Sequence, residues 1–365
     1  MRRVLGRALA VATAMLLAGC NAAYIMRGAY EECRILWNRK PIPQVIANPE
    51  LEPEIRTRLQ TVLAVRDFAQ DRLGLTVGGA YTTVSPVDTG AIVHVVMAAP
   101  RDSLEPYEWW FPIVGSVPYR GYFQESQAQA LAAQMEAQGY DTMVRPAVAF
   151  SSLGFFNDPL LSSLLRLNKV ELAGVITHEL FHRTYFLPSN ATFDESAANY
   201  VGTRGAIEFF KDSEGDSAPD TVAARGIFDS DLKFSRFLLQ AQAKLLRIYT
   251  SDLSNDEKLK RREVAFAEIK SDYAKLKPTL SGLERFDLDK QPLNNAVLIN
   301  YLIYFHDLDN FVALERINHG DLRATIQRII ELAKTNPSDP FYAIWQAVNQ
   351  APSAQSSRGM TIPPG

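Results

Sequence analysis

The chain has 365 residues, of which 47% are hydrophobic, and 38 Lys and Arg stand against 41 Asp and Glu. This composition excludes a disordered chain, and a formal charge of −3 argues against a dedicated nucleic-acid binder, which normally carries a basic excess. Two cysteines exclude a disulfide-built scaffold and any Cys-rich zinc or iron–sulfur module.

The first twenty residues have the layout of an export signal. Three arginines precede an apolar stretch, Ala8 to Ala18, which is too short for a permanent membrane span. Leu17-Ala18-Gly19-Cys20 resembles a bacterial lipobox, in which the cysteine becomes the lipidated first residue of the mature protein. The alternative is an ordinary secretory signal with a chance cysteine.

Cleavage before Cys20 leaves 346 residues with a charge of −6. Because Asn and not Asp follows Cys20, the sorting rule of such lipoproteins favours the outer membrane. We therefore expect a signal peptide over 1–19, a single domain over 20–350 and a disordered tail over 351–365, with the domain lipid-anchored in the bacterial envelope and facing the periplasm. Cys33 is then expected to be a buried or incidental thiol.

The rest of the chain predicts a mixture of helices and a few strands. In its first half we expect a helix over 50–74, a buried strand over 91–99, a shaped loop over 109–123, a helix over 126–138 and a strand over 143–152. The second half predicts a helical hairpin from 230–249 and 255–277, then helices over 294–314 and 320–334.

One motif points to chemistry. The stretch VELAGVITHELFHRTYF, residues 170–186, has helical apolar spacing and contains His178-Glu179-Leu180-Phe181-His182. Positions i and i+4 share a helix face, so both imidazoles can bind one Zn²⁺ ion. Glu179 is close enough to take a proton from a water on that metal, which makes it the candidate general base. We therefore expect an α+β fold, predominantly α-helical, with a small β-sheet next to this helix.

A catalytic zinc needs a third protein ligand and keeps a fourth position open. Glu195 is the preferred candidate, at the start of a helix after the loop over 187–190, and a solvent-facing charge is the alternative. Asp194 is expected to cap that helix or to support a ligand from the second shell. Asn199, one turn beyond Glu195, could hold a ligand histidine or could be an ordinary helix-contact amide.

HELFH followed by FDESAANYVG resembles the gluzincin metallopeptidases, whose metal is held by two histidines and a glutamate of a following helix. More narrowly, the segments over 111–115, 119–123, 150–154 and 158–161 resemble a bacterial family described as predicted aminopeptidases, over nearly the whole mature chain. Two residues depart from that pattern, because Asp194 stands where Asn is expected and Phe150 where Tyr is expected. The resemblance implies a metallopeptidase.

Peptide hydrolysis also needs a group that stabilises the oxyanion. Tyr119, Arg120 and Tyr122 are the best candidates, in a loop shaped by Gly and Pro; packing aromatics with a structural Arg are the alternative. Weaker candidates for the same role are Tyr185, Tyr301 and Tyr304.

These observations together predict a zinc-dependent, aminopeptidase-like enzyme that hydrolyses peptides in the periplasm with a metal-activated water. Its expected cofactor is Zn²⁺ and its expected partners are a peptide and, through the anchor on Cys20, a membrane. A second hypothesis is a non-catalytic envelope lipoprotein with a structural metal site, which acts as a scaffold. A third is an enzyme of the same type that cuts the stem peptides of peptidoglycan.

Overall fold

The computed structural model describes residues 27–28, 30–31, 33–87, 93–111, 114–147, 157–282, 286, 288–289 and 292–350. The predicted signal peptide, Cys20 with its predicted lipid, Phe150 and the tail from residue 351 lie outside these residues. Cys33 is among the described residues and is exposed, so the prediction that its thiol is buried is wrong.

Helices make up most of the described chain and small sheets accompany them, which confirms the predicted α+β class. The helices are α3 (Ile42–Ile46), α4 (Pro53–Asp71), α5 (Glu125–Ala137), α6 (Lys169–Thr184), α7 (Ala191–Glu214), α8 (Pro219–Tyr249), α9 (Asn255–Leu276), α10 (Asn295–Phe305), α11 (Leu308–Ile317), α12 (Leu322–Thr335) and α13 (Pro340–Gln350). The strands are β1 (Lys40–Pro41), β2 (Thr83–Ser85), β3 (Val93–Pro100), β4 (Trp109–Phe111), β5 (Gly115–Val117), β6 (Arg120–Tyr122), β7 (Tyr140–Ala147) and β8 (Leu160–Leu161).

Two predicted elements need correction. The segment predicted as a shaped loop contains the short strands β4, β5 and β6, because Gly115 at φ 74° allows a tight hairpin between the first two. The helix predicted over 294–314 is two helices, α10 and α11, which are separated at Asp307. The backbone of Asp307 is left-handed, with φ 52°, and cannot continue a right-handed helix. The structure also contains α13, which periodicity did not indicate.

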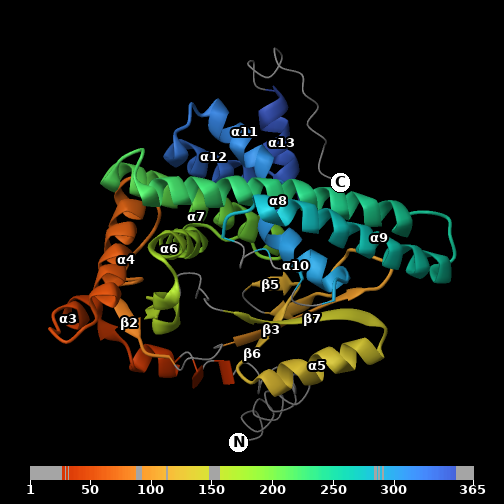
Figure 1. Ribbon diagram of the computed structural model, residues 1–365, viewed down its shortest axis with the longest axis horizontal. Coiled ribbons are helices and arrows are strands. Elements are labelled where there is room, and N and C mark those ends of the chain that lie inside the picture. Colours follow the sequence, from red (N-terminus) through yellow and green to blue (C-terminus); the bar gives the residue numbers. More distant parts are fainter. Residues whose placement is uncertain are drawn as a thin grey trace, which may run out of the picture.

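The sheet β6-β3-β7 lies between two helices. Its strands are antiparallel, with α5 on one face and α10 on the other (Figure 1). Val95 and Met97 of β3 join the main core on the α10 side, whereas Val96 packs with Ala128 and Ala132 of α5. This alternation follows from the two-residue period of a strand, and it decides which side chains of β6 and β7 can face the interior of the molecule.

Helix α8 crosses the whole molecule in Figure 1, with α11, α12 and α13 on one side of it and α6, α10 and the sheet on the other. Helices α6 and α7 are packed against each other more closely than a side chain would allow. A Cβ added at Gly202 of α7 would lie 2.7 Å from the carbonyl oxygen of Gly174 and 3.1 Å from Cβ of His178. The absence of a side chain at Gly202 therefore allows the two helix backbones to meet at the level of the HELFH motif.

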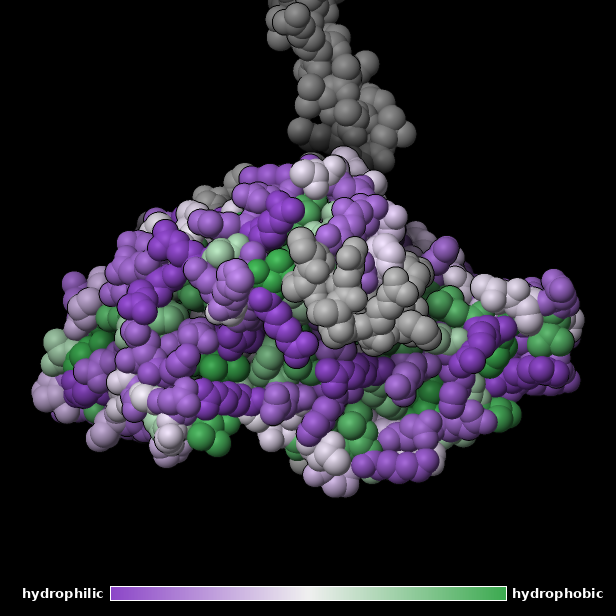
Figure 2. Space-filling view, turned by 90° about the horizontal axis from the view of Figure 1, so that it is seen from above, coloured by the Kyte–Doolittle hydropathy of each residue, from purple (hydrophilic) through white to green (hydrophobic). Residues whose placement is uncertain are grey.

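The face seen in Figure 2 is mainly hydrophilic, with hydrophobic residues in small separate groups. Scattered apolar residues of this kind are normal on a globular protein. Among the helices of the described residues, none combines the length and apolar character needed to cross a membrane.

Candidate metal centre

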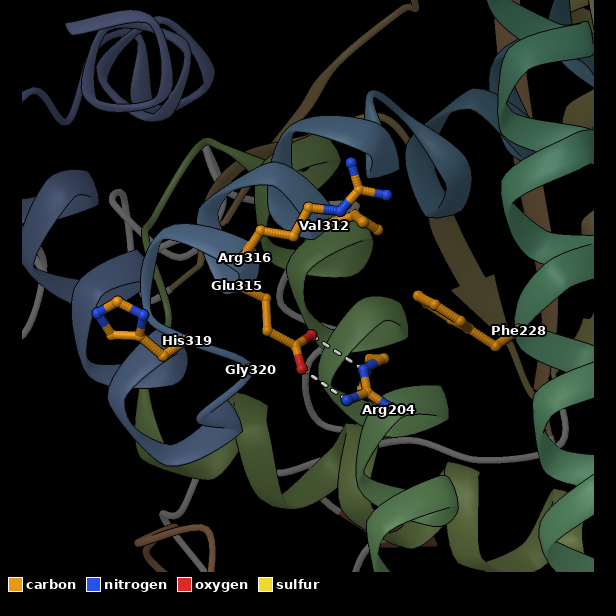
Figure 3. Close-up of a pocket in the computed structure, with 7 residues that line it drawn as sticks. All are labelled: Arg204, Phe228, Val312, Glu315, Arg316, His319 and Gly320. Atoms are coloured by element: carbon orange, nitrogen blue, oxygen red, sulfur yellow. Dashed lines mark hydrogen bonds and ion pairs between the residues drawn. The ribbon is translucent and has the colours of Figure 1, made fainter. Parts of the chain in front are cut away.

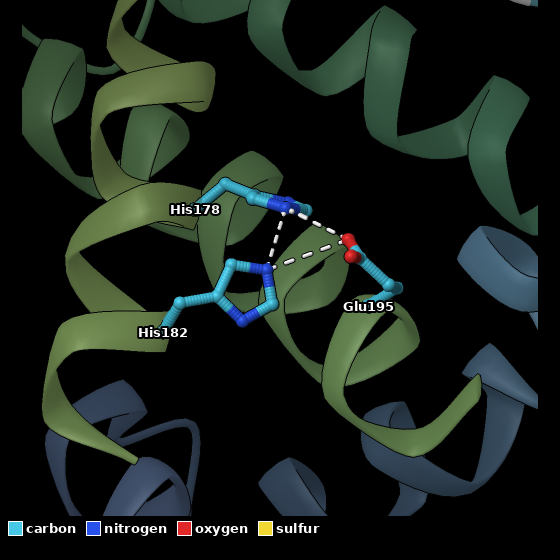
Figure 4. A group of neighbouring side chains, drawn as sticks. All are labelled: His178, His182 and Glu195. Carbon is cyan, nitrogen blue, oxygen red and sulfur yellow. Dashed lines mark hydrogen bonds and ion pairs between the residues drawn. The ribbon is translucent and has the colours of Figure 1, made fainter. Parts of the chain in front are cut away.

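Helix α6 presents two histidines on one face. Asn168 and Glu171 form a reciprocal capping box at its start, which satisfies backbone donors there and fixes where the helix begins. One turn apart, His178 and His182 bring their Nε2 atoms to 3.1 Å from each other (Figure 4). The convergence predicted from the i, i+4 spacing is therefore present.

Glu195 reaches the same point from α7. Its Oε2 atom lies 3.3 Å from Nε2 of His178 and 3.4 Å from Nε2 of His182, so the three atoms form a nearly equilateral triangle. Three ligand atoms held about 2.0–2.1 Å from one tetrahedral ion lie about 3.3–3.4 Å apart. Two imidazoles and one carboxylate are also donors that zinc prefers. His178, His182 and Glu195 thus form a possible metal site, and their geometry fits zinc.

The charges of this cluster favour a bound cation. Burial raises the pKa of the Glu195 carboxyl group, but His182 and His178 lower it well below the ordinary range. Burial lowers the pKa of His182, yet nearby carboxylates outweigh burial and raise it to about 9. The buried carboxylate therefore needs a positive partner, which is either a proton on His182 or a metal ion at the triangle.

Glu179 stands beside the triangle. Its side chain is buried, and burial raises the pKa of its carboxyl group, whereas His178 and His182 lower it; the net shift is upward. One residue along a helix turns a side chain by about 100°, so Glu179 does not share the histidine face. A buried carboxyl group with a raised pKa, next to a metal site but outside the ligand set, has the properties of a general base.

The two predicted supporting residues are both buried. Asp194 does not cap α7, because the N-cap is Asn190 and Asp194 lies inside the first turn, so the capping prediction is wrong. Its Oδ1 atom accepts the N–H of Leu187, and burial raises its pKa to about 8. The charges of Asp194 and His182 shift each other's pKa, which keeps a supporting role open for Asp194. Asn199 lies on the same helix and its side chain is enclosed.

The three residues predicted to stabilise an oxyanion do not lie together in the structure. Tyr119 lies at the centre, and its hydroxyl donates a long hydrogen bond of 3.5 Å to Oε1 of Glu195. Arg120 and Tyr122 pair with Val96 and His94 across the sheet, so they lie on the face covered by α5. There the Arg120 guanidinium stacks over the Tyr122 ring, 5.5 Å from its centre. We therefore leave Arg120 and Tyr122 out of the proposed site.

Sequence reasoning did not find Arg145 and Asn300, and it placed Tyr304 behind other tyrosines. Arg145, on the α10 face of β7, donates from Nε to Oδ1 of Asn300 at 2.7 Å and from Nη2 to the hydroxyl of Tyr304 at 3.0 Å. The ring of Tyr304 lies nearly parallel to that of His178, with centres 6.4 Å apart. The signal in the sequence that could have indicated Arg145 is a charged residue within a strand that is otherwise predicted to be buried.

The two remaining tyrosine candidates of the sequence, and the nearby His306, lie away from the triangle. Tyr185 is the C-cap of α6, with the Lys334 ammonium 5.9 Å from its ring centre, and Tyr301 packs edge-on against Phe234. The His306 ring packs against Phe341, and burial lowers its pKa to about 4.

A cavity of about 410 Å³ opens between α7, α8 and α11 (Figure 3), and none of the proposed site residues lines it. Arg204 of α7 and Glu315 of α11 line this cavity and form an ion pair. Glu315 also accepts a hydrogen bond from the Tyr200 hydroxyl. The ion pair joins α7, which carries Glu195, to the helices on the far side of α8. We interpret this region as structural support for α7.

Residues 23–340 match the model of a protein family described as "Putative aminopeptidase". The chain belongs to this family. The match spans all the elements that build the centre, from the strands around Tyr119 to the helix of Tyr304, and it assigns this aminopeptidase family member to the peptide hydrolases. Among curated proteins and among solved structures, nothing matches the chain.

Proposed function

We propose that the protein is a zinc-dependent peptidase that acts on the periplasmic side of a bacterial envelope, held there by lipid on Cys20. The observation that carries the zinc assignment is the triangle of His178, His182 and Glu195, whose ligand atoms lie 3.1–3.4 Å apart. The family supports peptide hydrolysis, and the lipobox-like start supports the location.

In this proposal each residue has one task. The two imidazoles and the Glu195 carboxylate hold the ion, which supplies a Lewis acid and a water acidified to a pKa of about 7. Glu179 takes a proton from the attacking water and returns it to the leaving amine. The hydroxyls of Tyr119 and Tyr304 are the available donors to the oxygen that gains negative charge.

The buried position of Glu179 favours an enzyme over a scaffold with a structural metal site. A structural zinc site is closed by four protein ligands and needs no base, whereas in the described part of the chain three ligands converge and a carboxyl group stands beside them. An amide at position 179 would keep the size of the side chain and lose the proton-accepting function, so it separates the two hypotheses.

The experiment compares the wild-type protein with Glu179→Gln, Glu195→Gln and the surface control Glu268→Gln of α9, which is exposed. Zinc per chain is measured, and cleavage of a peptide library is followed. We expect Glu179→Gln to keep zinc and lose turnover by about 10²–10⁴-fold, and Glu195→Gln to bind zinc more weakly. A wild-type protein with full zinc that cleaves no peptide overturns the proposal. If Glu179→Gln loses the metal while Glu195→Gln keeps it, the two roles are exchanged.

A further inference from the structure

A partly buried arginine, Arg145, stands next to the candidate metal centre and forms no ion pair with a carboxylate of the described residues. Its hydrogen-bond acceptors are the Asn300 amide oxygen, the Tyr304 hydroxyl and the carbonyl of Pro146. Removing a guanidinium from water destabilises a fold unless it is well bonded. Burial lowers the pKa of Arg145, but Tyr304 and the charge of Glu195 outweigh burial and raise it. The position therefore needs a reason beyond packing.

The hydrogen bond from Arg145 determines where the Tyr304 hydroxyl can point. A phenol has one proton to donate, and an oxygen that accepts from a guanidinium must direct that proton elsewhere. The guanidinium also lies 5.6 Å from the centre of the Tyr304 ring, so it holds the ring as well as the oxygen. Asn300, one turn before Tyr304 on α10, also holds the guanidinium by accepting a hydrogen bond from Nε. Arg145 and Asn300 together support the hydroxyl of Tyr304.

Tyr304 and Tyr119 differ in the hydrogen-bond partners of their hydroxyl groups. The Tyr119 hydroxyl is directed at Oε1 of Glu195. The Tyr304 hydroxyl instead accepts a hydrogen bond from Nη2 of Arg145 at 3.0 Å. The Tyr304 ring stacks on His178 at 6.4 Å. Tyr304 therefore stands beside one proposed ligand of the triangle, and its hydroxyl proton, unlike that of Tyr119, is not donated to Glu195.

We propose that Tyr304 donates the hydrogen bond that stabilises the oxyanion, that Arg145 is a positioning residue for Tyr304, and that Tyr119 instead holds the ligand Glu195. No proton is transferred by Tyr304, since the hydroxyl only donates a hydrogen bond while Glu179 moves the proton. This division of roles rests on the proposed peptidase function and assigns the residues that the sequence left open.

The test uses the full zinc-loaded protein and the variants Tyr304→Phe, Tyr119→Phe, Arg145→Lys, Arg145→Gln and the double variant Arg145→Gln/Tyr304→Phe. Zinc affinity is measured by chelator competition, and kcat and KM are measured on a cleaved peptide. Binding of a phosphonopeptide is measured as well, because this compound mimics the tetrahedral oxyanion and needs no turnover. Thermal unfolding shows that each variant is folded.

We expect Tyr304→Phe to lower kcat by about 10²–10³-fold with little change in KM or zinc affinity, and to weaken phosphonopeptide binding. Tyr119→Phe is expected to weaken zinc binding by about tenfold and to lower the kcat of the loaded enzyme far less than Tyr304→Phe does. Arg145→Gln should lower kcat in the wild-type background and have no further effect in the Tyr304→Phe background, and Arg145→Lys should restore part of the loss.

Two kinds of failure are distinguishable. A wild-type protein that neither cleaves peptides nor binds the phosphonopeptide overturns the proposed function, and this inference with it. If the wild type does both and Tyr304→Phe changes neither kcat nor phosphonopeptide affinity, only the role of Tyr304 is overturned. If Arg145→Gln lowers kcat equally with and without the Tyr304 hydroxyl, Arg145 acts independently and is not a positioning residue.

Discussion

The close crossing of α6 and α7 makes Gly202→Ala a sensitive test of how the metal centre is built. A methyl group at position 202 would lie 2.7 Å from the Gly174 carbonyl oxygen, about 0.7 Å inside ordinary van der Waals contact, which begins at 3.4 Å. The obstacle is backbone and cannot rotate away. We therefore expect α7 to move by several tenths of an ångström away from α6, and Glu195 to move with it.

The expected effect has two parts. Alanine in place of glycine in a helix adds about 1 kcal/mol of stability, and overpacking costs about 1–3 kcal/mol, so the net change in the free energy of unfolding lies between about zero and 2 kcal/mol of destabilisation. Zinc affinity should fall more clearly, by about 10- to 100-fold, because the ligand triangle tolerates only about 0.5 Å of displacement.

Gly174→Ala is the matched control at the same crossing. A Cβ at Gly174 meets its nearest neighbour, the carbonyl oxygen of Gly202, at 3.8 Å, which is ordinary contact. This variant should gain about 0.5–1 kcal/mol and bind zinc as the wild type does. Thermal unfolding of the metal-free protein and chelator competition measure the two quantities. If Gly202→Ala binds zinc normally, or if Gly174→Ala weakens binding equally, the crossing does not set the geometry of the centre.

Three further predictions concern other parts of the molecule. Cys20→Ser should move the protein from the membrane fraction to the soluble fraction, and unchanged fractionation would exclude Cys20 as the lipid anchor. Glu315→Gln leaves the partly buried Arg204 without its main partner and with only Glu208, and it should lower stability by about 3 kcal/mol, seen as a lower Tm. The exposed-pair control Glu268→Gln should change stability by less than about 1 kcal/mol, and equal shifts would contradict a supporting role for the Arg204–Glu315 pair. Burial lowers the pKa of His306 to about 4, so the unfolded chain binds a proton below about pH 6.5 that the folded chain does not, and stability falls as the pH drops from about 6.5 to 4. His306→Asn should remove about 2–3 kcal/mol of this loss in unfolding measurements at pH 4.5 and 7, and an unchanged difference between the two pH values would refute the assignment.

The parts of the centre that sequence predicts are those set by local geometry. His178 and His182 converge because four residues make one helical turn, and this holds wherever the helix packs. Glu195 follows after one short loop, so few arrangements could keep it away from the histidines. The α+β class follows in the same way, from the summed periodicity of long segments.

The parts that sequence did not predict depend on register and on distant pairing. Tyr119 faces the centre while Arg120 faces α5, and one residue of strand register decides between them. Arg145 and Tyr304 are 159 positions apart and meet only because α10 covers the sheet. The break at Asp307 is a single left-handed residue inside a continuous apolar pattern, which periodicity cannot detect.

The packing of α6 against α7 also has a consequence for the order of folding. All three residues of the triangle lie within one helical hairpin, between positions 178 and 195, so only a short loop must close to assemble them. The Arg145–Tyr304 contact requires closure of a far longer loop, and contacts of high sequence separation form slowly. An ion captured by the hairpin would link α6 to α7 before the sheet and α10 are in place. Metal uptake would then act as an early step in folding, and the chain would become competent for chemistry only when α10 docks.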